Sequence, residues 1–352
     1  MILDKLVGLL SHDIAIDLGT ANTIVCVRGK GIVCVEPSVV AVKRGTNEVL
    51  MGGNAVGTVA KAMMDMAPAS IQVIRPMKDG VVADFAIAEA MIRYFVRRVH
   101  NRGWLIRPRV LMAVPAGINQ VEKRAVIEST KAAGARAVFL IEEPKAAGIG
   151  VGLPITEPRA SMVVDIGGGT TEVAVLSLGD IVTHESLKIA GDEMDEAIIQ
   201  HMRKAYNMDV GHRTAEAIKI QIGSVYPLEQ ELTMEIRGKD YIRGLPRKET
   251  IDSQEIREAL KEPAQAIVNA IKQTLERTPP GLSGDLVDNG MTLCGGGSQL
   301  RGIDKVIERE TGLTVHTVKE PMKAVARGAE IVLDQLDELA RKGVLESGED
   351  ES

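Results

Sequence analysis

Two short segments of the chain combine the residue types that could hold a polyphosphate. The first, DIAIDLGTANTIVCV (13–27), aligns with the second, SMVVDIGGGTTEVAVL (161–176), so that Asp17 matches Asp165 and Gly19 matches Gly167. Each segment reads as an apolar strand, an Asp-apolar-Gly turn and a second apolar strand, which is typical of a β-hairpin. A duplicated hairpin predicts two similar domains.

The turns of both hairpins predict phosphate contacts. Glycine lets backbone N–H groups approach an anion closely, and hydroxyl side chains add further donors. The expected contacts are Gly19, Thr20, Ala21, Asn22 and Thr23 on one side and Gly167, Gly168, Gly169, Thr170 and Thr171 on the other. Asp17 and Asp165 would repel the phosphates and each other. We therefore expect a Mg²⁺ ion between these two carboxylates, held through its retained waters.

A third group of polar residues follows a buried strand in the segment LIEEPKAAGIG (140–150). Ligands of α/β proteins gather at the carboxyl ends of strands. Glu143 comes directly before a predicted helix, so it is expected to orient a water for attack on a γ-phosphate. For Glu142 we favour a simpler explanation, which is the attraction of acidic residues to a helix N-terminus.

A late glycine run predicts the surface for the base and ribose. Gly295, Gly296 and Gly297 follow the apolar strand MTLC, and a backbone without side chains would let a purine lie flat on it. Glu216 and Lys219, three residues apart on one helix, are candidate ribose or base contacts. An exposed ion pair between them is an equally good explanation. Gly191, at the start of a helix, completes the predicted nucleotide-binding set.

The remaining pattern predicts an α/β protein. Apolar residues at helical spacing, an Asn cap at 119 and a Pro near the start of a helix at 144 mark the elements between and after the hairpins. The predicted helices are 84–100, 119–133, 144–150, 193–205, 215–222 and 253–277, the last with a kink at Pro263, and the predicted strands are 110–114, 138–141 and 291–294. We also expect a hairpin over 232–251 with charged turn residues 237–240, and a last strand and helix that end near Leu339.

Composition narrows the class of protein. The 352 residues suggest about two domains, and with 45% apolar but only 2% aromatic residues the cores must consist of aliphatic side chains. A net charge of −6 argues against a general nucleic-acid binder. Cys26, Cys34 and Cys294 lack CxxC spacing, so we expect buried thiols in a reducing compartment. The chain has neither a transmembrane span nor a signal-peptide pattern.

Two segments predict contact with a membrane surface. In 1–10 the apolar residues Ile2, Leu3, Leu6, Val7 and Leu10 fall on one face of a helix, although the segment is too short to be a stable helix alone. The loop NRGWLIRPR (101–109) holds Trp104 and Leu105 among several arginines, which suits an anionic bilayer. The alternative for Trp104 is packing against its own domain.

Longer strings identify a family resemblance over nearly the whole chain. Asp-x-Gly-Thr, Val-Pro-Ala-Gly, a second Asp-x-Gly-Gly-Gly-Thr and a late Gly-Gly-Gly, in this order, resemble the actin, Hsp70 and sugar-kinase superfamily. DIAIDLGTANT, IRPMKDGVVADF, LIEEPKAA and MVVDIGGGTTEVAVLSLG are similar to the MreB family of bacterial actin-like cell-shape proteins. Ala190, where the family usually has Gly, and Lys145, where Met is common, depart from its pattern.

The resemblance implies an actin-like ATPase fold, with two duplicated RNase H-like domains and four subdomains around a nucleotide cleft. The expected domains are 1–152 plus 324–342 (small subdomain 33–77), 153–323 (small subdomain 183–258) and an acidic, disordered tail over 343–352. It also implies slow Mg-ATP hydrolysis, with GTP as an alternative, and Glu143 and Thr170 as the pair that positions the water. The implied partners are the protein itself in antiparallel double protofilaments, the inner face of the cell membrane, an adaptor protein and the cell-wall elongation machinery.

The same superfamily also contains proteins with other functions. A small-molecule kinase is the main alternative, but it needs an additional catalytic Asp that the sequence does not offer convincingly. A chaperone of the Hsp70 type needs a substrate-binding domain after the ATPase unit. A scaffold that does not hydrolyse nucleotide would not need Glu143. The sequence therefore predicts a polymerising ATPase.

Overall fold

The computed structural model describes residues 13–99, 107–341 and 345–347. The chain forms two compact units. Unit 1 consists of Met1–Glu157 and Met322–Ser352, and unit 2 consists of Pro158–Pro321. Each unit contains one copy of the duplicated hairpin. The predicted membrane residues Ile2, Leu3, Leu6, Val7, Leu10, Trp104 and Leu105 lie outside the described residues.

Unit 1 is built on a mixed six-stranded sheet in the order β18-β9-β8-β1-β2-β3. Its strands are β1 (Ile14–Leu18), β2 (Asn22–Val27), β3 (Gly31–Pro37), β4 (Val40–Lys43), β5 (Ile71–Ile74), β6 (Met77–Lys78), β7 (Val81–Val82), β8 (Arg109–Val114), β9 (Ala137–Glu142) and β18 (Glu346–Ser347). Its helices are α2 (Leu50–Gly53), α3 (Thr58–Met63), α4 (Phe85–Val99), α5 (Gln120–Ala132), α6 (Glu143–Gly150), the 3-10 turn η2 (Pro321–Lys323), α12 (Ala324–Asp334) and α13 (Leu336–Arg341). The strands β4 and β5 form a separate small sheet.

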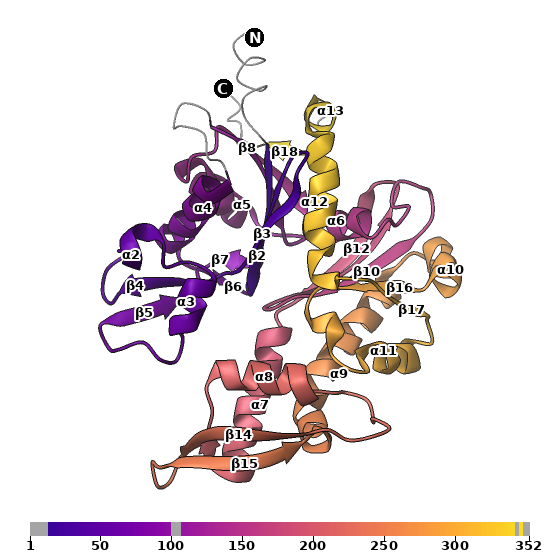
Figure 1. Cartoon of the computed structure of the whole chain (residues 1–352). Helices are drawn as coiled ribbons and strands as arrows, with labels where there is room; N and C mark the ends of the chain where they lie inside the picture. The colour runs from indigo at the N-terminus through magenta and orange to yellow at the C-terminus, as the bar shows by residue number, and fades with distance from the viewer. Residues whose placement is uncertain (1–12, 100–106, 342–344, 348–352) are drawn as a thin grey trace. The chain divides into compact units, whose positions relative to one another are not determined.

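Alternation along β1 distributes side chains between the two faces of this sheet. Ile14 and Ile16 belong to the hydrophobic core that also contains side chains of α4 and α5. Ala15 is also buried, but its side chain lies on the opposite face of the sheet. On the other face α12 contacts β1, β2, β8 and α6, and Figure 1 shows α12 and α6 on that side of the strands.

The helix α5 begins where predicted, because Asn119 and Glu122 form a reciprocal capping box with two hydrogen bonds of 2.9 Å.

Unit 2 repeats this plan. Its five-stranded sheet has the order β12-β11-β10-β16-β17, with antiparallel pairs at one side and parallel pairs at the other, as for β3-β2-β1-β8-β9 in unit 1. The elements are β10 (Ser161–Ile166), β11 (Thr171–Ser177), β12 (Asp180–Leu187), α7 (Gly191–Tyr206), β13 (Met208–Asp209), α8 (His212–Ile222), β14 (Thr233–Asp240), β15 (Pro246–Asp252), α9 (Ser253–Arg277), α10 (Pro280–Asn289), β16 (Met291–Cys294), η1 (Gly297–Gln299), α11 (Ile303–Thr311) and β17 (Val315–Thr317). The matching strand order confirms the duplication predicted from the two hairpins.

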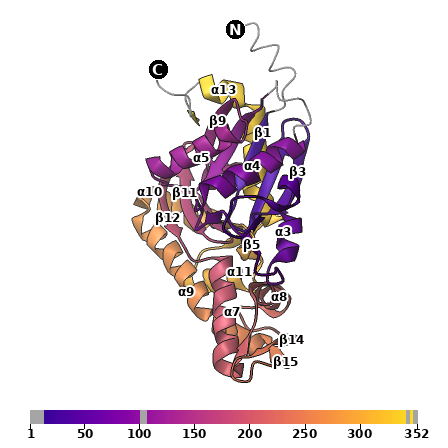
Figure 2. The ribbon, with the colours of Figure 1, turned by 90° about the vertical axis from the view of Figure 1, so that its left-hand side faces the viewer.

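Figure 2, turned by 90°, shows the long helix α9 running from the sheet of unit 2 to the β14–β15 hairpin. Asp252 caps α9 by accepting hydrogen bonds from the N–H groups of Gln254 and Glu255, and the helix continues through Pro263. The aliphatic core of this unit includes Ile198 on α7, Ile218 on α8 and Ile267 on α9. All three cysteines of the chain are buried and free, as the sequence predicted.

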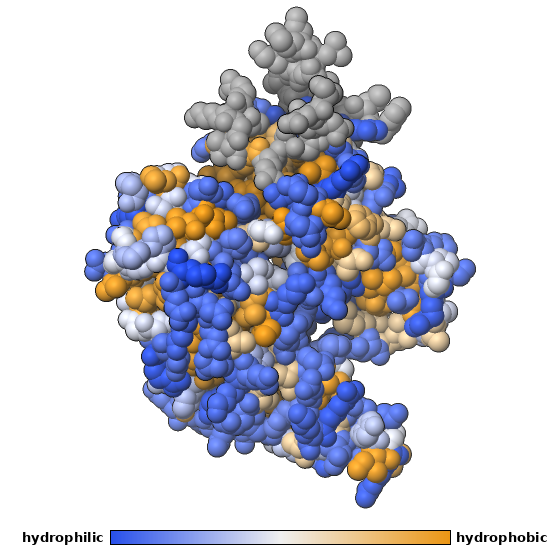
Figure 3. All heavy atoms as spheres, turned by 180° about the vertical axis from the view of Figure 1, so that it is seen from behind, coloured by the Kyte–Doolittle hydropathy of each residue, from blue (hydrophilic) through white to orange (hydrophobic). Residues whose placement is uncertain are grey.

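The predicted turn of the β14–β15 hairpin was wrong. Residues 237–240 belong to β14, and the chain reverses over 241–245. The reason is local: the Asp240 carboxylate accepts hydrogen bonds from the N–H groups of Ile242 (2.9 Å) and Arg243 (2.7 Å), and Gly244 has φ +72°. Ile242 is 75% exposed there, and Figure 3 shows a hydrophobic spot at the end of this hairpin, at the lower right.

The predicted disorder of the tail 343–352 does not hold for Glu346 and Ser347. These two residues form β18, which pairs antiparallel with Leu140 and Phe139 of β9. The unpaired edge of β9 offers backbone donors and acceptors, and two residues of the tail satisfy them.

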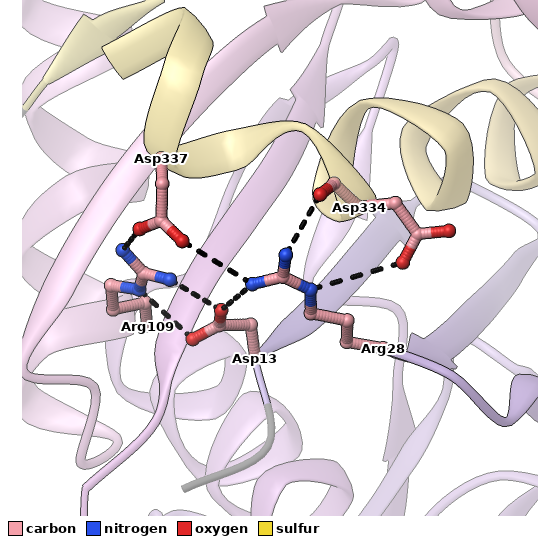
Figure 4. A network of polar contacts seen from close by, with 5 residues as sticks. All are labelled: Asp13, Arg28, Arg109, Asp334 and Asp337. Carbon is pink, nitrogen blue, oxygen red and sulfur yellow. Dashed lines mark hydrogen bonds and ion pairs between the residues drawn. The ribbon is translucent and has the colours of Figure 1, made fainter. Parts of the chain in front are cut away.

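A polar network fastens α12 and α13 to the sheet of unit 1 (Figure 4). The buried Asp13 carboxylate accepts two hydrogen bonds from Arg109, from Nε at 2.9 Å and from Nη2 at 2.5 Å. Arg28 lies 3.2 Å from Asp13 and donates a 2.8 Å hydrogen bond to the backbone oxygen of Asp334, at the end of α12. Arg109 also pairs with Asp337, and this contact holds the pKa of Asp337 below its usual range.

Candidate functional site

The first predicted loop connects β1 to β2 in unit 1. Leu18 pairs with Thr23 across the turn. A Cβ atom at Gly19 would lie 2.8 Å from the backbone oxygen of Asn22, so only glycine fits this position. Asp17 lies at the end of β1, one residue before the turn begins. The structure thus places the predicted Asp and Gly side by side at a tight hairpin tip.

Hydroxyl groups hold this loop from inside unit 1. The buried Ser38 hydroxyl donates to the backbone oxygen of Gly19 (2.6 Å) and lies 2.8 Å from the Thr23 hydroxyl. The backbone N–H of Ser38 donates to the oxygen of Ala21 at 3.0 Å. Thr20 is 7% exposed, and its hydroxyl accepts a 3.1 Å hydrogen bond from the N–H of Gly80. Thr20 and Thr23 therefore already use their hydroxyls to shape the loop.

The second predicted loop connects β10 to β11 in unit 2. The N–H of Gly167 donates to the oxygen of Thr170 at 2.8 Å, which closes the turn. The Thr171 hydroxyl donates to the backbone oxygen of Ile189 at 2.8 Å. Gly168 is partly exposed between these anchors, while Gly169 and Thr170 are buried in this conformation. The same strand–turn–strand geometry therefore occurs once in each unit.

Asp165 lies at the end of β10 with its carboxyl group buried. Burial without a compensating charge raises its pKa to about 6. Its strand neighbour is Cys294, whose thiol pKa is raised by burial and by the Asp165 charge. A dication beside Asp165 would stabilise the ionised carboxylate, so this buried acid fits the predicted Mg²⁺ site.

The late glycine run packs against the end of β10. A Cβ at Gly295, which has φ +78°, would lie 2.2 Å from Asp165 Oδ1, and a Cβ at Gly297 would lie 2.4 Å from Ile166 Cγ2. Only Gly296 of the three is exposed. The structure thus brings the run next to Asp165, and close packing within unit 2 accounts for two of its glycines.

The start of α7 touches the second loop. The N–H groups of Gly191 and Asp192 donate to the backbone oxygens of Gly167 (3.2 Å) and Gly168 (2.7 Å). Ala190 precedes them with φ −158°, which is outside the positive-φ range that favours glycine. Glu193 accepts a 2.9 Å hydrogen bond from the Ala190 N–H.

Lys219 and Glu216 lie on α8, beside α7. The Lys219 ammonium donates to the oxygen of Gly191 at 2.7 Å and lies 2.9 Å from Asp195 Oδ1. Asp195 is buried, and burial raises its pKa to about 6 although Lys219 acts in the opposite direction. The sequence reasoning missed Asp195 and Ser38, because their partners are distant in the sequence.

Glu142 and Glu143 stand at the junction of β9 and α6 in unit 1. Glu142 ends the strand and forms a 2.8 Å ion pair with Lys145, which agrees with a structural role. This pair also accounts for Lys145, the second departure from the family pattern. Glu143 is the first residue of α6, and Pro144 follows it. Both acids remain partly exposed.

Comparison with known proteins decides the family. The family model for MreB/Mbl protein matches residues 11–341. The chain belongs to the MreB/Mbl family. The cell shape-determining protein MreB of Escherichia coli is 49% identical over 336 residues, which cover 95% of this chain and 97% of that protein. The cell shape-determining protein Mbl of Bacillus cereus is 48% identical over 336 residues, 96% of this chain and 100% of that protein.

Solved structures agree with the MreB/Mbl assignment. The crystal structure of MreB5 of Spiroplasma citri bound to ADP has a TM-score of 0.88 at 35% identity, over 94% of this chain and 98% of that one. The same protein bound to AMPPNP also gives 0.88. The MamK double helical filament, at 22% identity and a TM-score of 0.75, shows the fold alone. The chain therefore has the actin-like α/β fold.

Proposed function

We propose that this MreB/Mbl family member binds Mg-ATP, with GTP as the alternative, through its two hairpin loops and polymerises in response. The observation that carries the proposal is the repeated Asp-x-Gly turn, present once in each unit with the same strand register. MreB5 of Spiroplasma citri, which shares this fold, has been solved with ADP and with AMPPNP. Phosphate would bind the N–H groups of the two glycine turns.

The metal would bind through Asp17 and Asp165. Within the described ranges, no group of three or more His, Cys, Asp or Glu side chains is arranged to hold an ion. Mg²⁺ commonly relies on one or two carboxylates, several waters and the substrate phosphates. When bound, it would neutralise charge on the phosphates and favour the ionised form of Asp165.

Glu143 and Thr170 are proposed to position the attacking water. Glu143 starts a helix directly after a strand, where its carboxylate can accept a proton from water. Thr170 contributes its hydroxyl from the second loop. Slow hydrolysis of this kind would couple nucleotide state to filament dynamics.

Two adjacent glutamates provide a matched test of this role. Glu143→Ala should leave the affinity for Mg-AMPPNP largely intact and slow phosphate release by about 10²–10⁴-fold. Glu142→Ala, which removes the ion pair with Lys145, should stay within a few-fold of wild type. Phosphate release at the wild-type rate in Glu143→Ala would refute the assignment.

The assembled state is proposed to be an antiparallel double protofilament on the inner face of the cell membrane, where an adaptor protein and the cell-wall elongation machinery would join it to maintain cell shape. Relatives named cell shape-determining proteins support this role. Among the described residues, no helix has the length and apolar character needed to cross a bilayer. Adhesion is proposed to depend on the segments 1–10 and 101–109.

The attachment points of these two segments support a common lipid contact. Asp13 lies three residues after the end of the first segment, and Arg109 ends the second. Asp13 and Arg109 form the two-hydrogen-bond pair of Figure 4, so the described chain next to each segment lies at neighbouring points of unit 1. Light scattering on a lipid surface tests the proposal, because signal should require both Mg-ATP and lipid with anionic head groups.

A further inference from the structure

Two arginines beside the loop 101–109 are held by carboxylates of their own unit. On α4, Arg98 Nη1 lies 3.0 Å from Glu36 Oε1. At the start of β8, Arg109 makes its two hydrogen bonds to the buried Asp13. A charge-assisted pair of this kind must be broken before its arginine can bind another anion. Arg98 and Arg109 therefore serve the fold of unit 1.

Two other arginines near these pairs have no such partner. Arg97 and Arg136 are exposed, and neither side chain forms a hydrogen bond or an ion pair within the part of the chain that the structure describes. Arg97 is the direct neighbour of Arg98 on α4, and Arg136 comes directly before β9. Their charges are a local positive surplus in a chain whose net charge is −6.

The sheet of unit 1 places Arg136 beside the start of β8. The N–H of Arg136 donates to the backbone oxygen of Pro108 at 2.9 Å. The next residue, Ala137, pairs with Arg109 in the parallel register of β8 and β9. Arg136 therefore lies at the amino-terminal edge of these two strands, where the chain enters β8 from the loop 101–109.

The helix α4 brings Arg97 toward the same edge. One turn earlier on α4, Arg93 donates from Nη2 to the backbone oxygen of Ala132, at the end of α5 and four residues before Arg136. Residues four apart share one face of a helix, so Arg97 lies on this face one turn nearer the loop. The two unpaired guanidinium groups therefore stand on the two sides of the loop 101–109.

The place of these charges indicates the kind of anion that they would meet. Asp13 and Arg109 are bonded to each other at this edge, so the described chain next to both predicted apolar segments is also here. An occupant that satisfies the segments and the arginines together must offer apolar material and negative charge over a broad surface. An anionic bilayer offers both, and a soluble phosphate ion offers only the charge.

We propose that Arg97 and Arg136 bind the phosphates of anionic lipid head groups and so orient unit 1 on the bilayer. The inference rests on the proposed membrane association, and it names the charged contacts of that association. A guanidinium group suits this role, because its planar N–H groups bind two oxygens of one phosphate at once. An anionic bilayer repels a chain of net charge −6 as a whole, so a local positive surplus decides which end approaches.

Vesicle binding of the full chain tests this surface. Wild type, Arg97→Gln, Arg136→Gln and the double variant are titrated, with Mg-AMPPNP present, with vesicles of phosphatidylcholine that contain or lack phosphatidylglycerol. Arg44→Gln is the matched control, because Arg44 is exposed after β4 and its side chain also has no bonded partner among the described residues. Thermal melting checks folding, and sedimentation without lipid checks assembly.

Each single variant should lower the affinity for phosphatidylglycerol vesicles by about fivefold or more, and the double variant should lose more than either, because each arginine near an anionic surface contributes separately. Added salt should weaken wild type more than the double variant. Binding to phosphatidylcholine alone should change much less. Arg44→Gln should bind as wild type does, and so should Arg98→Gln/Glu36→Gln, which removes an ion pair without changing the net charge.

Wild-type affinity of the double variant for phosphatidylglycerol vesicles would overturn the inference. An equal loss in Arg44→Gln would also overturn it, because total charge would then determine binding. Equal losses on phosphatidylcholine alone would exclude a contact with the anionic head groups. All three results leave the proposed membrane association standing, because wild type would still bind. If wild type does not bind phosphatidylglycerol vesicles in Mg-AMPPNP, the proposed association itself fails.

Discussion

The contact between α6 and α12 in unit 1 gives the sharpest stability prediction. A Cβ added at Gly328 would lie 1.7 Å from the backbone oxygen of Ala146, and one added at Gly150 would lie 2.0 Å from the oxygen of Ala324. Ordinary contacts of this kind are about 3.4 Å or longer. Gly328→Ala must therefore separate two helix backbones by more than about 1 Å, and backbone atoms cannot move aside as a flexible side chain would.

Overpacking in a core typically costs about 1–3 kcal/mol, and a backbone clash of this size falls at or above the upper end, so we expect a loss of about 3 kcal/mol or more. Gly284→Ala in α10 is the control, because it is also a helical glycine but an added Cβ meets nothing within 4 Å. It should gain up to about 1 kcal/mol from helix propensity.

Urea unfolding followed by circular dichroism measures both variants. The same substitution in the two helices has a similar effect on the unfolded chain, so the difference between them reports the native contact. A Gly328→Ala protein as stable as Gly284→Ala would refute the close helix contact.

Two further predictions concern pH and lipid. Burial raises the pKa of Asp195 from 3.8 to about 6, with Lys219, Glu216 and Asp192 as its charged neighbours, so the native state binds this proton more tightly than the unfolded chain does. The free energy of unfolding of wild type should therefore rise by up to about 3 kcal/mol relative to Asp195→Asn as pH falls from above 6 to about 4. A difference between the two proteins in urea unfolding that does not change with pH would contradict this prediction. In liposome co-sedimentation, pelleting of the protein should require Mg-ATP, because many weak anchors on a filament act together. Pelleting should fall when residues 2–10 are deleted and nearly vanish when Trp104→Ala and Leu105→Ala are added to that deletion. Full pelleting of this combined variant, if it is folded, would exclude both segments as anchors.

Local sequence signals predicted most of the framework. The hairpins at Asp17 and Asp165, the Asn119 cap and the helix at α9 follow from residue types within a few positions of one another. The family strings added the actin-like fold, which the solved relatives confirm. Composition alone would have given only an α/β protein of about two domains.

Elements that depend on distant partners were predicted poorly. The strand β18 exists because Glu346 and Ser347 pair with β9, about 200 residues earlier in the chain, and no local pattern signals such pairing. The half-exposed edge strand β12 was not predicted, although its side chains alternate in exposure. The helix α10 was also missed, because two glycines lower its helix propensity.

The same limit applies within the site. Ser38 supports the first loop from 19 residues away, and Asp195 directs Lys219 from another helix. Spacing along α8 placed Lys219 beside Glu216, but the structure supplies a partner on α7. Sequence reasoning could name the residue types that are expected to bind phosphate, and the structure was needed to find the hydrogen-bond and ion-pair partners of Gly19 and Lys219.

Calorimetric titration of Mg-AMPPNP into wild type, Asp17→Ala and Asp165→Ala tests the central claim most directly, with the exposed Asp288→Ala as control. If the two hairpins share one Mg-nucleotide, each of the first two variants should weaken binding strongly in Mg²⁺, the control should bind as wild type does, and the deficit should shrink when EDTA removes the metal. Wild-type affinity in both Asp17→Ala and Asp165→Ala would contradict the account.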